Sequence, residues 1–258
     1  MKNSAMRSAT ALLIMALTCP SGLAAQPGAG KSVKNAFDFT GSIGFTQTRG
    51  NASADNINVG NTLVYKVGGW VFKEDLAFLY REANKQVNTS FWNGGLRGDR
   101  NIAGRIALFL ASRYDRNQPQ GVLNRYQQGF GMSIRAMDDE HNKLSVALGG
   151  SLFSQELSPG VVAKVSRAFP AARAAVDYRY QFSSRAWMQH SAEYLPAVGD
   201  TASSFFFNTE SSLVAPITEN VGVRLGYILR YNSEPPLKGE QQLRTTDIFF
   251  SSGLTVTF

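Results

Sequence analysis

The chain has 258 residues, with 26 lysines and arginines against 19 aspartates and glutamates. This length fits one large domain. The basic residues are spread along the chain instead of forming a patch, which argues against nucleic-acid binding. A single cysteine and two histidines exclude an internal disulfide and disfavour a transition-metal site.

The N-terminal end of the chain predicts a signal peptide. Lys2 and Arg7 precede the apolar residues 9–17, and small residues follow them. We expect cleavage after Ala24 or Ala25. The alternative, a transmembrane anchor, is disfavoured because an apolar stretch of about ten residues is half the length that a bilayer requires.

From about residue 37 onward, apolar and polar residues alternate in stretches of about ten residues. In residues 221–231, for example, every odd position carries Val, Leu or Tyr, whereas Arg224 and Arg230 occupy even positions. Successive side chains of a strand point to opposite faces, so each stretch predicts a strand with one apolar and one polar face.

Twelve strands are expected on this basis. In chain order they are 37–48, 55–66, 70–82, 88–98, 104–115, 124–136, 143–155, 171–182, 185–195, 203–214, 220–232 and 243–258. An even number places both chain ends on the same side, as in bacterial single-chain barrels.

The connections between these strands alternate in length. The short ones are 66–70, 98–104, 137–143, 182–185 and 214–220. The longer ones are 48–55, 115–124, 155–171, 195–203 and 232–243, with 82–88 as the weakest member of that set. Short periplasmic turns opposite longer outer loops are typical of outer-membrane barrels.

Aromatic residues on the apolar faces form two belts when the strands are laid alternately up and down. The periplasmic belt holds Phe37, Tyr65, Trp70, Tyr180, Phe182 and Phe258, and the outer belt holds Tyr80, Tyr114, Tyr126, Tyr194, Phe205 and Tyr231. Such belts favour the two interfaces of a membrane. We therefore predict an all-β fold, an up-and-down antiparallel transmembrane β-barrel of about 12 strands.

The expected domains are a signal peptide at 1–25, a flexible tail at 26–35 and the outer-membrane barrel at 36–258. Cys19 lies in the signal peptide, so the mature chain should contain no cysteine, which suits passage through an oxidising periplasm. Residues 25–32 fit a loose phosphate-binding loop. No strand precedes them, however, and we expect no nucleotide or other cofactor.

The last strand carries an expected assembly signal. Its residues are Phe250, Leu254, Val256 and the terminal Phe258. Alternating apolar positions that end in a terminal Phe resemble the signal read by the barrel assembly machinery, which we therefore expect as a partner during biogenesis.

Two segments carry a resemblance to a known family. Residues 41–51 (GSIGFTQTRGN) and 230–236 (RYNSEPP) resemble the YdiY-like family of salt-induced outer-membrane proteins, domain of unknown function family 481. Glu234 stands where that family typically has Asp, and the middle of the chain matches by pattern alone. The resemblance implies an outer-membrane barrel and no established activity or ligand.

The polar faces predict what fills the barrel. The expected lumen residues are Arg105, Arg113, Arg135, Arg173, Asp177, Arg179, Glu210, Arg224 and Arg230. These charges either pair in a network that narrows or plugs the lumen, or line a passive pore that prefers anions. Twelve strands leave a lumen between a filled eight-stranded barrel and an open porin. We favour a structural or stress-related barrel with a narrow or plugged lumen.

A lipid hydrolase is the remaining alternative. His190 and Ser191 are neighbours on one strand, so they point to opposite faces and cannot pair, and His190 would need a hydroxyl from an adjacent strand. His141 falls in a polar turn. We therefore expect no catalytic, cofactor or metal residues, and a monomer surrounded by outer-membrane lipids and lipopolysaccharide.

Overall fold

The computed structural model describes residues 36–48, 54–83, 86–117, 120–162, 167–199 and 204–257. The predicted signal peptide, the N-terminal tail with its phosphate-loop-like stretch, and Phe258 lie outside the described residues. Over the ranges just given, no helix has the length and apolar content needed to cross a membrane.

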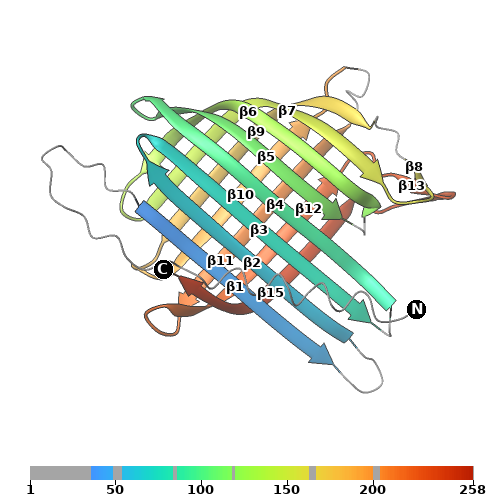
Figure 1. Ribbon diagram of the computed structural model, residues 1–258, viewed down its shortest axis with the longest axis horizontal. Coiled ribbons are helices and arrows are strands. Elements are labelled where there is room, and N and C mark those ends of the chain that lie inside the picture. Colours follow the sequence, from blue (N-terminus) through green and yellow to red (C-terminus); the bar gives the residue numbers. More distant parts are fainter. Residues whose placement is uncertain are drawn as a thin grey trace, which may run out of the picture. The chain divides into compact units, whose positions relative to one another are not determined.

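Twelve strands form a closed antiparallel barrel in the order β1-β15-β12-β11-β10-β9-β7-β6-β5-β4-β3-β2 (Figure 1). They are β1 (Ala36–Thr48), β2 (Ala54–Val67), β3 (Trp70–Ala83), β4 (Gln86–Ala103), β5 (Ile106–Asn117), β6 (Val122–Asp138), β7 (Asn142–Leu157), β9 (Ala168–Gln181), β10 (Trp187–Pro196), β11 (Phe205–Pro216), β12 (Val221–Asn232) and β15 (Thr246–Thr257). The predicted fold class is confirmed.

The first and last strands close the barrel. β1 pairs with β15 from Thr40 opposite Thr257 to Ile43 opposite Leu254. Both chain ends of the barrel therefore lie at one end, which we call the periplasmic end because short turns lie there in bacterial barrels. The opposite end is called the outer end.

The predicted break after Gly98 is wrong. β4 continues to Ala103, with Gly98 paired to Phe72 on one side and to Leu110 on the other. A glycine keeps both backbone hydrogen-bonding groups, so it weakens a strand without ending it. The turn falls instead at residues 104–105.

The outer surface of the barrel is apolar. On β5, Leu110 is 69% exposed whereas its neighbour Phe109 is 2% exposed, because successive side chains alternate between the outside and the lumen. Aromatic residues of both predicted belts, such as Trp70 and Tyr126, are exposed as well. A closed barrel with an apolar exterior satisfies its backbone in hydrocarbon, and the protein is an outer-membrane β-barrel.

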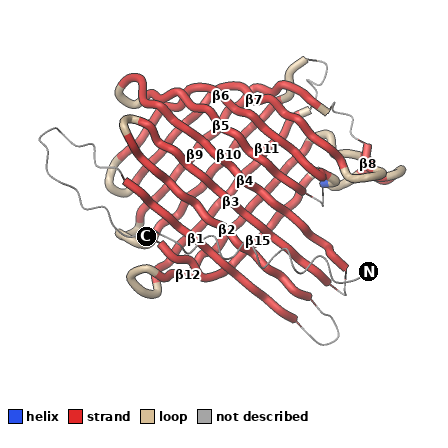
Figure 2. The backbone as a smooth tube through the Cα atoms, in the orientation of Figure 1, coloured by secondary structure: helices blue, strands red, loops and turns tan. Residues whose placement is uncertain are grey.

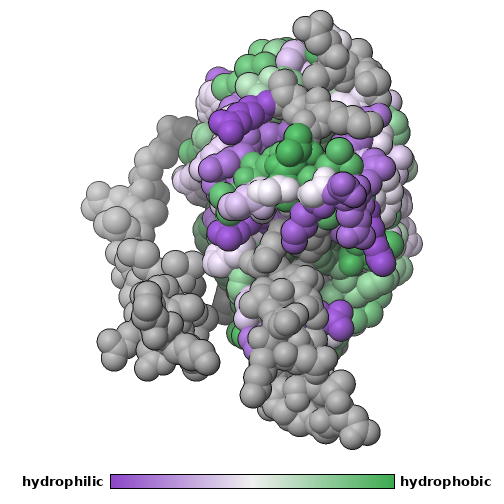
Figure 3. All heavy atoms as spheres, turned by 90° about the vertical axis from the view of Figure 1, so that its right-hand side faces the viewer, coloured by the Kyte–Doolittle hydropathy of each residue, from purple (hydrophilic) through white to green (hydrophobic). Residues whose placement is uncertain are grey.

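The outer end carries a small sheet that the sequence did not predict. β8 (Val161–Val162) pairs with β13 (Leu237–Lys238), which pairs with β14 (Gln241–Gln242). This three-stranded sheet, which we call the outer lid, joins two loops that lie far apart in sequence, and it lies at the barrel end opposite the C-terminus (Figure 2). Seen from that end, hydrophobic side chains gather within a hydrophilic rim (Figure 3).

Candidate functional site: the polar lumen

The lumen contains a cavity of about 490 Å³. Eight cationic and six acidic side chains line it. They are Lys73, Arg97, Arg113, Arg135, Arg173, Arg179, Arg224 and Arg230, with Asp38, Asp75, Asp99, Asp177, Glu193 and Glu210. The lining reaches the exposed Asn101 and the partly exposed Arg135, which lie beside the periplasmic turns, so the cavity extends to the periplasmic end.

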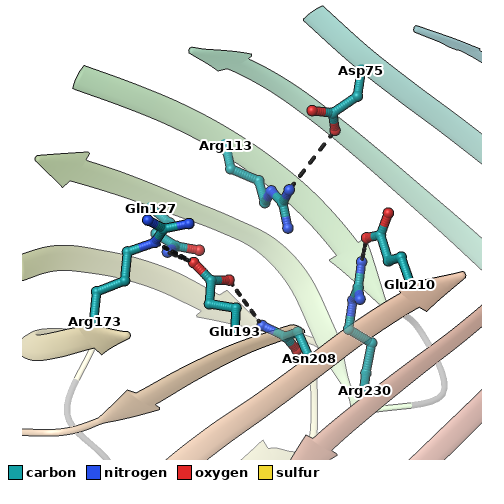
Figure 4. A network of polar contacts seen from close by, with 8 residues as sticks. All are labelled: Asp75, Arg113, Gln127, Arg173, Glu193, Asn208, Glu210 and Arg230. Carbon is teal, nitrogen blue, oxygen red and sulfur yellow. Dashed lines mark hydrogen bonds and ion pairs between the residues drawn. The ribbon is translucent and has the colours of Figure 1, made fainter. Parts of the chain in front are cut away.

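Three ion pairs cross the middle of the lumen (Figure 4). They are Arg113 with Asp75 at 3.8 Å, Arg173 with Glu193 at 2.5 Å, and Arg230 with Glu210. These six residues, called the central network below, carry three positive and three negative charges. The low effective dielectric of the site strengthens such pairs.

Amide side chains complete the central network. Gln127 Nε2 donates to Glu193 Oε1 at 3.3 Å, and Asn208 Nδ2 donates to Glu193 Oε2 at 3.4 Å. Glu193 thus accepts from three different side chains that come from β6, β9 and β11. These contacts fix the middle of the lumen across several strands.

Three aromatic side chains pack together inside the barrel on the outer side of this network. Phe153, Phe169 and Phe206 are 3–4% exposed and stack with ring centroids 4.8 to 5.8 Å apart. We call these three residues the phenylalanine plug. The guanidinium of Arg125 lies 5.1 Å from the Phe206 ring centroid.

A second cavity lies between the phenylalanine plug and the central network. It measures about 10 Å³, close to the smallest space that holds one water molecule. Phe153 and Phe206 line it from the plug, and Arg113 and Arg230 line it from the network. Side chains of both groups therefore approach one another closely around this cavity.

The loops that form the outer lid pack against the loop before β6. Ser158 donates its amide to the Gly121 carbonyl at 2.9 Å. A side chain on Gly121 would come within 2.9 Å of Val161 and 3.0 Å of Leu243. The loop before β6 is thus packed tightly beneath both loops that form the lid.

Eight of the nine predicted lumen residues line the main cavity; they are Arg113, Arg135, Arg173, Asp177, Arg179, Glu210, Arg224 and Arg230. Arg105 does not. It lies exposed in the turn after β4 and donates from Nη1 to the Ala136 carbonyl at 3.3 Å. The prediction for Arg105 was wrong because β4 extends five residues beyond the predicted end.

Sequence reasoning missed important members of the site. The predicted lumen set omits Glu193 and the Arg97–Asp99 pair, whose contacts measure 2.7 and 2.8 Å. The signal for Glu193 was available, because it shares an inward face of β10 with Gln189 and Ser191. The phenylalanine plug carried no such signal, since apolar residues are common on either face near a strand end.

The predicted assembly signal lies on the lipid-facing side where it is described. Phe250 is 76% exposed and Leu254 is 53% exposed, and Val256 is partly exposed. Exposure to lipid is compatible with recognition by another protein during insertion, and the signal stays a prediction.

The structure identifies the hydroxyl that neighbours His190. His190 Nδ1 lies 2.8 Å from Ser211 Oγ on β11, and Nε2 lies 3.5 Å from Thr209 Oγ1. This pair lies on the lipid-facing side, since the adjacent Gln189 and Ser191 line the lumen. Within the described ranges, no carboxylate is hydrogen-bonded to this imidazole, so the third group of a catalytic triad is missing there.

His141 lies in a periplasmic turn, as the sequence predicted. Asp139 Oδ1 accepts the amides of Asn142 at 2.7 Å and His141 at 2.9 Å. These two hydrogen bonds, of which that from Asn142 has the larger effect, hold the pKa of Asp139 below its ordinary value. Among the described residues, no group of three or more His, Cys, Asp or Glu side chains is placed to hold a metal ion.

Three solved structures share the barrel shape at low identity. The NanC porin is 10% identical, with 86% of this chain and 99% of that chain covered and a TM-score of 0.46. OmpT, an outer-membrane protein of Vibrio cholerae, is 9% identical, with coverages of 87% and 97% and a TM-score of 0.40. An anion-selective porin from Comamonas acidovorans is 7% identical, with coverages of 87% and 100% and a TM-score of 0.39.

No curated protein matches the sequence. A family match covers almost the whole barrel, however, and includes both segments whose resemblance was noted above. The chain belongs to the family of proteins of unknown function DUF481, whose model matches residues 41–258.

Proposed function

We propose that this protein is a non-conducting envelope component, a barrel sealed at its outer end with a polar chamber that faces the periplasm. The observation that carries the proposal is the phenylalanine plug beneath the outer lid. The plug occupies the lumen where a porin needs an open path, and only about 10 Å³ of space separates it from the central network. We further propose that the barrel has no catalytic activity of its own.

Solute uptake by proteoliposomes tests this function. Vesicles that contain the wild-type protein should swell in an isosmotic sugar solution no faster than protein-free vesicles. The triple variant Phe153→Ala, Phe169→Ala and Phe206→Ala should swell faster, because three large side chains are removed from the lumen. Rapid swelling with the wild-type protein would overturn the proposal.

A passive pore with anion preference is the second candidate. It is favoured by the excess of cations over acids in the lining, eight against six, because charged linings set ionic selectivity. In a conducting form of the barrel, Arg224→Glu and Arg230→Glu should each lower the preference for chloride over potassium. An unchanged preference would argue against these side chains as determinants of the path.

A further inference from the structure

We propose that the periplasmic part of the cavity is a binding site for a small oxyanion, held by Arg224 and Arg179. The inference rests on the proposed periplasm-facing chamber, because that chamber gives the ligand its route. The expected ligand is phosphate, sulfate or a short carboxylate. All three present negatively charged oxygen atoms that a guanidinium can bind through two parallel hydrogen bonds.

Arg224 differs from the four arginines of the main cavity that form short ion pairs. Arg97, Arg113, Arg173 and Arg230 each have a carboxylate oxygen within 4 Å. Within the described part of the chain, Arg224 forms no ion pair, and its one hydrogen bond runs from Nη1 to Ser42 Oγ at 3.1 Å. A guanidinium has five donors, so most of those on Arg224, which lines the cavity, have no acceptor among the described residues.

Arg179 is the second available cation. Its guanidinium lies 4.4 Å from the Trp187 ring centroid, and it has no hydrogen bond or ion pair with any residue that the structure describes. Stacking on Trp187, which is 7% exposed, holds the guanidinium plane while leaving its N–H edge for a ligand.

The register brings the two arginines to one region of the wall. Trp187 of β10 lies opposite Val214 of β11, and Val214 lies opposite Arg224 of β12. Adjacent strands are about 4.8 Å apart, which places Trp187 and Arg224 about 10 Å apart along this row. Arg179 reaches the same row through its contact with Trp187, so two long side chains can converge on one small anion.

The acids nearby leave this region positive. Asp38 is the acid whose charge acts on Arg179. It also lies close to Lys73, because both residues flank Val64 in the registers of β1, β2 and β3. Asp177 lies two residues before Arg179 on the same face of β9, and it offsets part of that charge. Arg224 has no acidic neighbour on β12, where Gly226 and Gly222 occupy the adjacent inward positions. The acid that acts on it is Glu210 of β11, which is already paired with Arg230.

The remaining lining near this row offers hydroxyl and amide groups. Ser42, Gln189 and Ser212 line the cavity and can donate to ligand oxygens. A cavity of about 490 Å³ admits a small oxyanion with several waters. We therefore expect the site to select its ligand by charge and size.

Trp187 provides a direct readout of binding. The chain has three tryptophans, and Trp70 and Trp92 are exposed on the outside. In a Trp70→Phe and Trp92→Phe background, Trp187 fluorescence of the detergent-solubilised protein is titrated with inorganic phosphate, then sulfate, then acetate, at constant ionic strength. We expect a saturable change for at least one of the three probes.

Matched variants assign the change to the site. Arg224→Gln should weaken binding about tenfold, since it removes one charged bidentate contact, and Arg224→Lys should restore part of the affinity. The control Arg185→Gln alters an exposed arginine of a periplasmic turn and should leave affinity unchanged. The affinity of the Arg179→Gln variant is measured by calorimetry, because this substitution alters Trp187 emission directly. Arg179→Gln should also weaken binding about tenfold.

Two results would overturn the site: no saturable change with any of the three probes, or equal affinity in folded Arg224→Gln and wild type. Heat-modifiable gel mobility verifies that each variant is folded. This test is separate from that of the proposed function, because binding in detergent does not require a sealed membrane. A conducting barrel that binds phosphate contradicts the first proposal alone, and a sealed barrel that binds no probe contradicts the second alone.

Discussion

Arg173 of β9 donates from Nε to Glu193 Oε1 of β10 at 2.5 Å, and the two side chains are 12% and 11% exposed. Neutralising one partner leaves the other charge buried. Breaking such a pair costs about 3 kcal/mol or more, and water in the adjacent cavity reduces this. We expect Glu193→Gln to lower the free energy of unfolding by about 2 kcal/mol, measured by urea unfolding in lipid vesicles.

The exposed pair Arg185–Glu219 is the control for this change. Its side chains are 51% and 83% exposed, so Glu219→Gln should alter stability by about 0.5 kcal/mol or less. The double replacement Arg173→Met with Glu193→Leu should cost less than Glu193→Gln alone, since neither charge remains. Equal effects of Glu193→Gln and Glu219→Gln would contradict the importance of the central network.

Gly253 forms part of the seam between the first and last strands. A side chain there would lie 2.3 Å from the Ile43 carbonyl oxygen of β1, a contact that requires backbone movement. We expect Gly253→Ala to destabilise the closed barrel by about 1–3 kcal/mol and to lower the folded fraction in a heat-modifiable gel assay. Gly98→Ala is the control, because its nearest contact would be an ordinary 3.4 Å, and a similar loss in both variants would count against the seam.

The turn at Asp139 predicts a pH dependence. Because its pKa is lowered in the folded protein, the carboxylate stabilises the fold at neutral pH. That contribution is lost as the pH falls below the ordinary carboxyl pKa of about 3.9 and through the lowered value. The stability difference between wild type and Asp139→Ala should therefore be largest near pH 7 and shrink at the acidic end, as measured by unfolding at a series of pH values.

The His190–Ser211 pair gives a prediction about enzyme activity. We expect the wild-type protein to leave phosphatidylethanolamine and phosphatidylglycerol vesicles intact, because the imidazole has no carboxylate partner within the described ranges. His190→Ala should cost about 0.5–1.5 kcal/mol through its lost hydrogen bond. Phospholipid hydrolysis that disappears in both His190→Ala and Ser211→Ala would establish a lipid hydrolase instead.

Period-two alternation was sufficient to predict all twelve barrel strands. Each strand meets hydrocarbon on one face and polar groups on the other, so its residues repeat with a period of two along about ten positions. β8, β13 and β14 have two residues each, too few for any periodicity. β4 was cut short because glycine was interpreted as a turn signal in a strand that tolerates it.

The lumen was predictable in charge and unpredictable in pairing. Alternation places Arg113, Glu210 and Arg230 inside, yet Asp75 and Arg113 lie on β3 and β5, which are not neighbours. Their contact depends on barrel curvature and on side-chain direction, which a sequence pattern does not encode. That Arg224 forms no ion pair within the described ranges is likewise visible only once the side chains are placed.

Single-channel recording in planar bilayers tests the sealed lumen most directly. We expect no current steps from the wild-type protein in molar potassium chloride, and discrete steps from the Phe153→Ala, Phe169→Ala and Phe206→Ala triple variant. Stable steps of equal size from both proteins would contradict a plug at the outer end of the lumen.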